Sequence, residues 1–183
     1  RMQYAEIFDL ASGGYYYFST NGLYDPNSTG VGHQPYGFDE YMQMFHRYRV
    51  VFSKIQIRVN NTNTTTDDSP NRVIILGTQR NNTNVNPTAM RESYRYKTAQ
   101  VPSGWPVYPT FLSKTWRARD FYNTADVRDS ISASGTEVAN PSNMNYYVIY
   151  MSNIGGGAAN SVTVEALITY YAIFSEPRTP AIS

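Results

Sequence analysis

Short apolar runs, separated by polar and turn-rich stretches, divide this chain into segments of strand length. The stretch Asn60–Asn71 contains no apolar residue, whereas Arg72–Thr78 and Tyr146–Met151 are almost wholly apolar. Between Val162 and Phe174 an apolar residue occupies every second position, which is the period of a strand with one buried face. Short strands with turn signals between them predict an all-β sandwich or barrel.

Three further regions supply the remaining strands. The region Ala5–Thr20 is interrupted by Ser12-Gly13-Gly14, and the other two regions are Tyr94–Val101 and Phe111–Tyr122. Together with the strand from Tyr48 to Val59, the pattern predicts seven or eight strands and no long helix. We expect a single eight-stranded jelly roll over residues 1–183, because this is the commonest architecture with such long polar loops.

One short helix is expected between Asp39 and Tyr48. Asp39 would cap this helix, since a carboxylate at that position accepts hydrogen bonds from the first backbone amides. Met42 and Phe45 would face inward.

The strand from Tyr48 to Val59 is predicted to contain a β-bulge. Its first apolar residues share one parity (Tyr48, Val50 and Phe52), and its later ones share the other (Ile55, Ile57 and Val59). One extra residue between Phe52 and Ile55 would bring both sets to the same face. The opposite face then carries basic side chains, namely Arg47, Arg49, Lys54 and Arg58.

Composition adds two constraints to this picture. Aromatic residues make up 15% of the 183 residues, including 17 tyrosines, and this excess suits both strands and contacts between subunits. The net charge of +1 shows that the body of the protein is not a polycation, and the absence of cysteine excludes disulfides and thiolate chemistry. No apolar run approaches the roughly 20 residues of a membrane helix.

The segment from Asn21 to Val59 contains five short motifs in a specific order. They are Leu23–Pro26, Gly32–Pro35, Gly37–Asp39, Tyr41–Tyr48 and Ser53–Ile55. In this segment, about a fifth of the chain, the sequence resembles the capsid proteins of circovirus-like viruses, the small viruses with a circular, Rep-encoding single-stranded DNA genome. The motif residues to which we assign a role in assembly are Tyr24, Asp25, Pro26, His33, Gln34, Pro35, Gly37, Phe38 and Asp39.

The resemblance implies a structural function. It implies a T=1 icosahedral shell of sixty copies, a packaged circular single-stranded DNA, and assembly in the host nucleus to give the virion. It also implies an arginine-rich N-terminal arm that binds DNA, of which this sequence carries only Arg1. The polar stretch Asn60–Asn71 would lie on the outer surface and contact a host receptor or glycan.

Two clusters combine basic and aromatic residues, the pattern that joins phosphate attraction to base stacking. The first is His46–Arg49 and the second is Lys114–Arg119. We expect these clusters to contact nucleic acid without sequence preference. The alternative is that they form solvated strand faces or salt bridges. The candidate nucleic-acid-binding residues are Arg1, Arg47, Arg49, Lys114, Trp116, Arg117 and Arg119.

The sequence offers little support for catalysis, a cofactor or a metal site. The only histidines are His33 and His46, and neither a nucleophile elbow nor a phosphate-binding loop is present. We expect His33 to hydrogen-bond a backbone group in its turn, in preference to a metal site with Asp25 and Asp39. No catalytic or metal-binding residue is assigned, and no cofactor is expected.

Two other functions fit the same architecture. One is the coat protein of a small RNA virus or of a satellite virus. The other, from a different class, is a carbohydrate-binding jelly-roll module in which tyrosines and Trp105 or Trp116 form sugar platforms. The first would assemble into a shell, and the second would remain a monomer or small oligomer.

Overall fold

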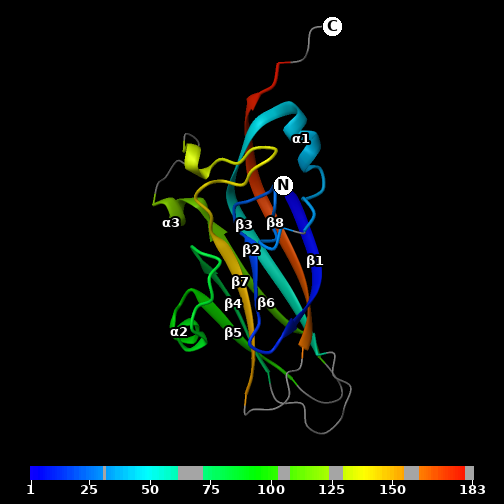
Figure 1. Cartoon of the computed structure of the whole chain (residues 1–183), viewed down its shortest axis with the longest axis vertical. Coiled ribbons are helices and arrows are strands. Elements are labelled where there is room, and N and C mark those ends of the chain that lie inside the picture. The colour runs from blue at the N-terminus through cyan, green and yellow to red at the C-terminus, as the bar shows by residue number, and fades with distance from the viewer. Residues whose placement is uncertain (31, 62–71, 103–107, 124–129, 155–160, 180–183) are drawn as a thin grey trace.

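The computed structural model describes residues 1–30, 32–61, 72–102, 108–123, 130–154 and 161–179 (Figure 1). These residues form eight strands that run roughly along the long axis of the molecule. The strands are β1 (Met2–Ala11), β2 (Tyr15–Ser19), β3 (Phe45–Asn61), β4 (Arg72–Gln79), β5 (Tyr96–Val101), β6 (Thr110–Arg117), β7 (Tyr146–Asn153) and β8 (Ser161–Pro177).

The strands make two antiparallel four-stranded sheets. The first sheet has the order β1-β8-β3-β6 and the second has the order β2-β7-β4-β5. Every connection between consecutive strands passes from one sheet to the other, except that β4 is followed by its neighbour β5. This order is that of an eight-stranded jelly roll, so the predicted fold class is confirmed.

The core lies between the two sheets and is unusually rich in tyrosine. Tyr4, Tyr48, Tyr147 and Tyr170 are among the largest fully buried side chains. Their hydroxyls keep hydrogen-bond partners, for example Tyr170 Oη to Ser19 O at 2.8 Å and Tyr147 Oη with Ser53 Oγ at 2.8 Å. Because an unsatisfied buried hydroxyl costs about 1–3 kcal/mol, these bonds let tyrosine fill the core.

The bulge in β3 is present, but it lies earlier than the sequence pattern predicts. The register shifts between Val50 and Phe52, so Ser53 and Ile55 follow Val50 on the inner face. Phe52 was expected to face inward and instead points outward, where its ring meets that of Tyr171 at 5.5 Å. The prediction for Phe52 is therefore wrong, because the apolar run Val50-Val51-Phe52 hides the position of the extra residue.

The predicted helix is present as α1 (Phe38–Met44), but Gly37 caps it and Asp39 does not. Gly37 has φ of 84°, a left-handed conformation that glycine adopts without strain. Asp39 lies in the first turn, where its charge interacts favourably with the helix dipole. Met42 is buried as expected, whereas Phe45 already belongs to β3.

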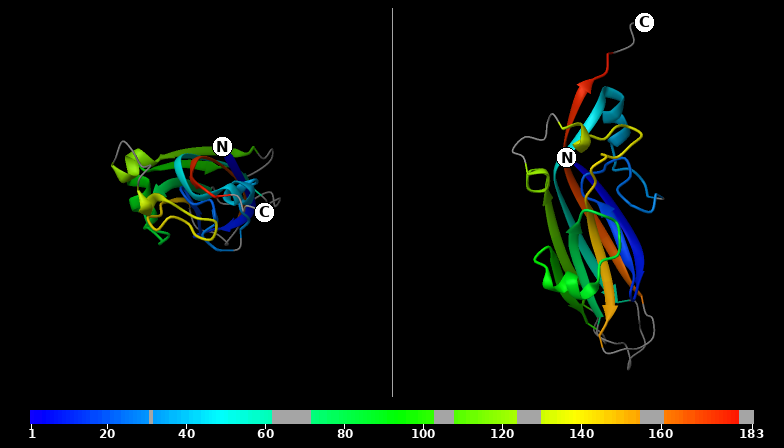
Figure 2. Two further views of the ribbon diagram at one scale, coloured as in Figure 1. Left: turned by 90° about the horizontal axis from the view of Figure 1, so that it is seen from above. Right: turned by 60° about the vertical axis from the view of Figure 1, so that its left-hand side comes forward.

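The described residues contain more short helices than the one expected. These are α2 (Pro87–Glu92), α3 (Ala118–Tyr122) and a 3-10 turn, η1 (Ile131–Ala133). The predicted strand Phe111–Tyr122 therefore ends at Arg117, and its last five residues turn into α3. Figure 2 shows α1 at one end of the sandwich and α2 at its side. Within the described ranges, no helix is long and apolar enough to span a membrane.

Candidate nucleic-acid interface

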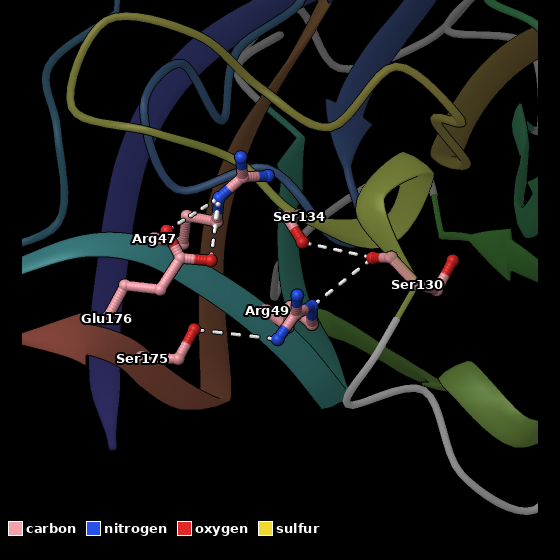
Figure 3. A network of polar contacts seen from close by, with 6 residues as sticks. All are labelled: Arg47, Arg49, Ser130, Ser134, Ser175 and Glu176. Carbon is pink, nitrogen blue, oxygen red and sulfur yellow. Dashed lines mark hydrogen bonds and ion pairs between the residues drawn. The ribbon is translucent and has the colours of Figure 1, made fainter.

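The first predicted basic cluster is tied into its own subunit. Arg49 is only 8% exposed, and its guanidinium donates to Ser130 O at 3.2 Å and to Ser175 Oγ at 3.5 Å (Figure 3). Arg47 forms an ion pair with Glu176, with 3.0 Å between Nε and the carboxylate. Both arginines thus join β3 to neighbouring segments, and Arg49 is withdrawn from the solvent that a phosphate would occupy.

The second predicted cluster is split by strand alternation. Lys114 and Trp116 pair across the sheet with Ile55 and Ser53, so their side chains share the inner face of the sheet. Trp116 is 6% exposed and packs against the rings of Phe121 and Tyr122 at 5.9 and 6.4 Å. Its expected role as a base-stacking platform is therefore not compatible with its burial in this subunit.

The remaining predicted cations differ in their surroundings. Arg119 is exposed on α3 and pairs with the neighbouring Asp120 at 3.3 Å. Arg117 is exposed at the end of β6, on the outer face of the first sheet. Arg1 is exposed immediately before β1.

The outer face of the first sheet carries cations beside aromatic rings. Arg117 pairs with Phe52, which in turn pairs with Tyr171, so these three side chains form one row across β6, β3 and β8. The adjacent row contains Lys54, and Arg58 lies further along β3 opposite Phe111. Arg58 is bonded to Glu165 at 3.4 Å. The basic face predicted for β3 is therefore confirmed in part, because Arg49 is buried and Arg47 and Arg58 are ion-paired. Among the described residues, the cations of this outer face without an ion-pair partner are Lys54 on β3 and Arg117 on β6.

A cleft of about 270 Å³ opens at the edge of β6 and gathers cations from both sheets. Arg80 follows β4, Arg95 precedes β5, and Lys114 and Arg117 belong to β6. Within the described residues, none of these four forms an ion pair. Burial lowers the pKa of Lys114, and the charge of nearby Lys97 on β5 lowers it further.

Sequence reasoning missed Arg80, Arg95 and Lys97. These residues are distant in sequence from Lys114 and reach it only because the two sheets pack face to face. One local signal was present in the sequence, since Tyr94-Arg95-Tyr96-Lys97 alternates aromatic and basic residues.

The motif segment between β2 and β3 packs on its own subunit. The backbone amides of Leu23 and Tyr24 donate to Tyr48 Oη at 3.0 and 3.2 Å. Phe38 is buried against the edge of the Tyr48 ring at 5.4 Å. Further backbone groups of the segment are bonded as well, among them Asp25 N to Asn140 Oδ1, Pro26 O from Ser19 N, and Pro35 O from Phe38 N.

The prediction for His33 is confirmed. Its Nε2 lies 3.0 Å from Ala5 O on β1, and its Nδ1 lies 2.8 Å from Gln34 O. Its ring lies against that of Tyr4 in a tilted arrangement, with 4.6 Å between the centroids. Asp39 lies apart on α1. The described part of the chain holds no group of three or more histidine or acidic residues arranged for a metal ion.

Comparison with known proteins identifies the fold. No protein-family model matches the chain, and no curated protein matches it. A chain of the Triatoma virus empty capsid superposes with a TM-score of 0.53 at 8% identity, covering 98% of this chain and 91% of that one. A second Triatoma virus chain gives 0.51 at 9% identity, with 97% and 66% covered. A chain of Cocksfoot mottle virus gives 0.46 at 12% identity, with 96% and 98% covered. At these identities, the likeness to the two Triatoma virus chains shows a shared fold and no more.

Proposed function

We propose that this protein is a viral coat protein whose copies assemble into a closed icosahedral shell around a nucleic-acid genome. The observation that carries the proposal is the strand order, β1-β8-β3-β6 facing β2-β7-β4-β5, over almost the whole chain. Nearly the same span superposes on a chain of the Triatoma virus empty capsid. A role in assembly requires no catalytic centre.

The finer form of the proposal comes from the circovirus-like segment Asn21–Val59. It comprises a T=1 shell of sixty copies, a circular single-stranded DNA genome, and assembly in the host nucleus. The contacts of this segment with Tyr48 and with β1 support its part in the proposal, because they give a rigid surface for neighbouring subunits to recognise. The coat protein of an RNA or satellite virus is the alternative that shares the fold.

The exposed aromatic surface supports self-association. Tyr36 is 94% exposed beside α1, and Tyr108 is also largely exposed. Tyrosine is enriched in the buried parts of protein interfaces, because its ring is large and its hydroxyl stays hydrated at the rim. We therefore assign Tyr36 and the neighbouring motif residues to contacts between copies of this chain.

Contact with the genome is assigned to the outer face of the first sheet. Lys54 and Arg117 lie there beside Phe52 and Tyr171, which combines phosphate attraction with flat rings. Arg1 stands at the start of β1, where an upstream basic arm would continue. The host-contact residues proposed within Asn60–Asn71 lie mostly outside the described residues.

The carbohydrate-binding alternative receives less support from the structure. Trp116 is enclosed by Phe121 and Tyr122 and offers no platform to a sugar ring. Trp105 lies outside the described residues.

Sedimentation velocity on the purified chain, alone and with an arginine-rich N-terminal arm added, tests the proposal. We expect a single fast-sedimenting species with either version, and co-purified nucleic acid that DNase removes once the shell is opened. A slow monomer or small oligomer with both versions at every salt concentration would contradict the coat-protein assignment. Co-purified nucleic acid sensitive only to RNase would replace the DNA genome by the RNA alternative.

A further inference from the structure

The cleft at the edge of β6 combines three features that a surface cluster of cations ordinarily lacks. Its cations come from both sheets, they have no ion-pair partners among the described residues, and one of them is partly buried. Exposed cations are usually solvated and far apart. Four cations that line one cleft repel one another, and this repulsion is unfavourable unless an opposite charge offsets it. A bound anion supplies one, because it offsets the repulsion between the two sheet edges.

The surroundings of Lys114 agree with this crowding. Burial lowers the pKa of its ammonium, and so does the positive charge of Lys97 on the facing edge strand. Asp120 also lines the cleft, but it is paired with Arg119. The cleft therefore holds Arg80, Arg95, Lys114 and Arg117 against one carboxylate, that of Asp120, which already pairs with Arg119.

The cleft also presents aromatic rings. Arg80 lies over the Phe121 ring, with 5.3 Å from its guanidinium carbon to the ring centroid, and this contact holds the guanidinium at the cleft. Tyr94 is 88% exposed, and Arg95 lies 6.0 Å from its ring centroid. A free ring beside several cations suits a ligand that carries both phosphates and flat bases.

We propose that this cleft binds the phosphodiester backbone of single-stranded nucleic acid, with Tyr94 stacking on a base, and that bound phosphate holds the edges of the two sheets together. The choice of nucleic acid over other polyanions rests on the proposed function. Recognition of phosphate rests on the cleft alone. Arg117 belongs both to the cleft and to the basic outer face of the first sheet, so a strand lying on that face would continue into the cleft.

Fluorescence anisotropy with labelled oligodeoxythymidine of about 20 nucleotides measures this binding on unassembled subunits. The logarithm of affinity should fall with the logarithm of salt concentration, with a slope of about −0.7 for each phosphate contact. The double variant Arg80→Gln/Arg95→Gln should bind at least tenfold more weakly, with a slope shallower by about 1.4. Tyr94→Ala should weaken oligonucleotide binding about tenfold while leaving tripolyphosphate binding unchanged.

Arg91→Gln is the matched control. The Arg91 guanidinium donates to Ser152 Oγ on β7, and Ser152 pairs with Val73 on β4. Val73 is five residues along β4 from Thr78, which lines the cleft, so Arg91 lies away from the cleft. It should bind the oligonucleotide as the parent does. Tripolyphosphate should raise the thermal unfolding midpoint of the parent and of Arg91→Gln, and raise that of the double variant much less.

Three results would overturn the inference. Equal binding of the oligonucleotide by the double variant and by Arg91→Gln would place the contact elsewhere. An unfolding midpoint that tripolyphosphate leaves unchanged would remove the link between the sheets. Variant-sensitive binding of heparin without binding of the oligonucleotide would make the cleft a sulfated-polysaccharide site. Shell formation is followed separately by sedimentation, so intact shells with any of these results would leave the proposed function standing.

Discussion

At the scale of single residues, buried tyrosines and their hydroxyl bonds hold the loops onto the sandwich. Tyr48 is the clearest case, because its hydroxyl accepts from two amides of the motif segment and lies 3.1 Å from Asn140 Oδ1. Tyr4 and Tyr16 both donate to Glu6, which also accepts from Asn27. The core of this protein is therefore polar at its margins, where it meets the segment between β2 and β3.

Tyr48→Phe should lower the free energy of unfolding by about 2–4 kcal/mol, since it leaves buried backbone donors without an acceptor. Urea denaturation followed by circular dichroism measures this loss. Tyr36→Phe removes a hydroxyl from a ring that is almost fully exposed and should change stability by less than about 0.5 kcal/mol. Equal stability of the two variants would show that the Tyr48 hydroxyl does not anchor the motif segment.

The raised pKa values of Tyr16 and Tyr17 predict how the stability of the protein depends on alkaline pH. Burial, with the hydrogen bond to Glu6, raises the pKa of Tyr16 to about 12, and burial raises the pKa of Tyr17 to about 12. Both pKa values in the folded protein exceed the ordinary pKa of 10, so folding favours the neutral hydroxyls. Their contribution to the free energy of unfolding is therefore complete below about pH 10 and is lost as the pH rises through 12. The urea midpoint should fall over that interval, and less steeply in Tyr16→Phe/Tyr17→Phe. A midpoint that stays constant from pH 10 to 12 would contradict this assignment.

At the scale of elements, β3 and β6 both carry basic residues, but the arginines at the start of β3 are engaged within the subunit. The arginines at the start of β3 are bonded to Ser130, Ser175 and Glu176, and those bonds join β3 to β8 and to the segment before η1. On β6, Arg117 is exposed and Lys114 is partly buried, and both line the cleft at the sheet edge. The two clusters look alike in sequence and differ in what surrounds them.

Arg49→Gln should therefore act on stability and not on binding. We expect it to lower the free energy of unfolding by about 1.5–3 kcal/mol, as the loss of hydrogen bonds from a buried charged group does. Its affinity for oligodeoxythymidine should equal that of the parent at a temperature where both are folded. A variant of unchanged stability with weakened binding would return Arg49 to the nucleic-acid interface.

Sequence alone predicted most elements and only part of the candidate site. The regular alternation along β8 identified that strand, because every second residue faces the core. Phe52 and the segment Ala118–Tyr122 were assigned wrongly, since an apolar run conceals a bulge and aromatic residues continue past the end of β6 into α3. Arg80 and Arg95 escaped notice because their proximity to Lys114 depends on how the two sheets pack.

At the scale of the whole molecule, the two sheets leave different surfaces for different partners. The motif segment and α1 cover one end and expose Tyr36, whereas the edge of β6 opens into the basic cleft. We assign the first surface to other copies of the chain and the second to nucleic acid. Assembly and nucleic-acid binding should therefore respond to different substitutions.

Tyr36→Glu should block assembly without unfolding the subunit, because it places a charge in a contact that must lose water. We expect slow sedimentation together with an unchanged urea midpoint. Tyr36→Phe, which keeps the ring, should still form the fast species. Normal assembly of Tyr36→Glu would remove this residue from the subunit interface.

A cryo-electron microscopy reconstruction of the assembled particles tests whether copies of this chain form a closed icosahedral shell. We expect uniform particles of sixty jelly rolls, with the motif segment at contacts between subunits. Particles built from open sheets or helical arrays, or a preparation that stays monomeric both with and without an added arginine-rich arm, would overturn the coat-protein assignment.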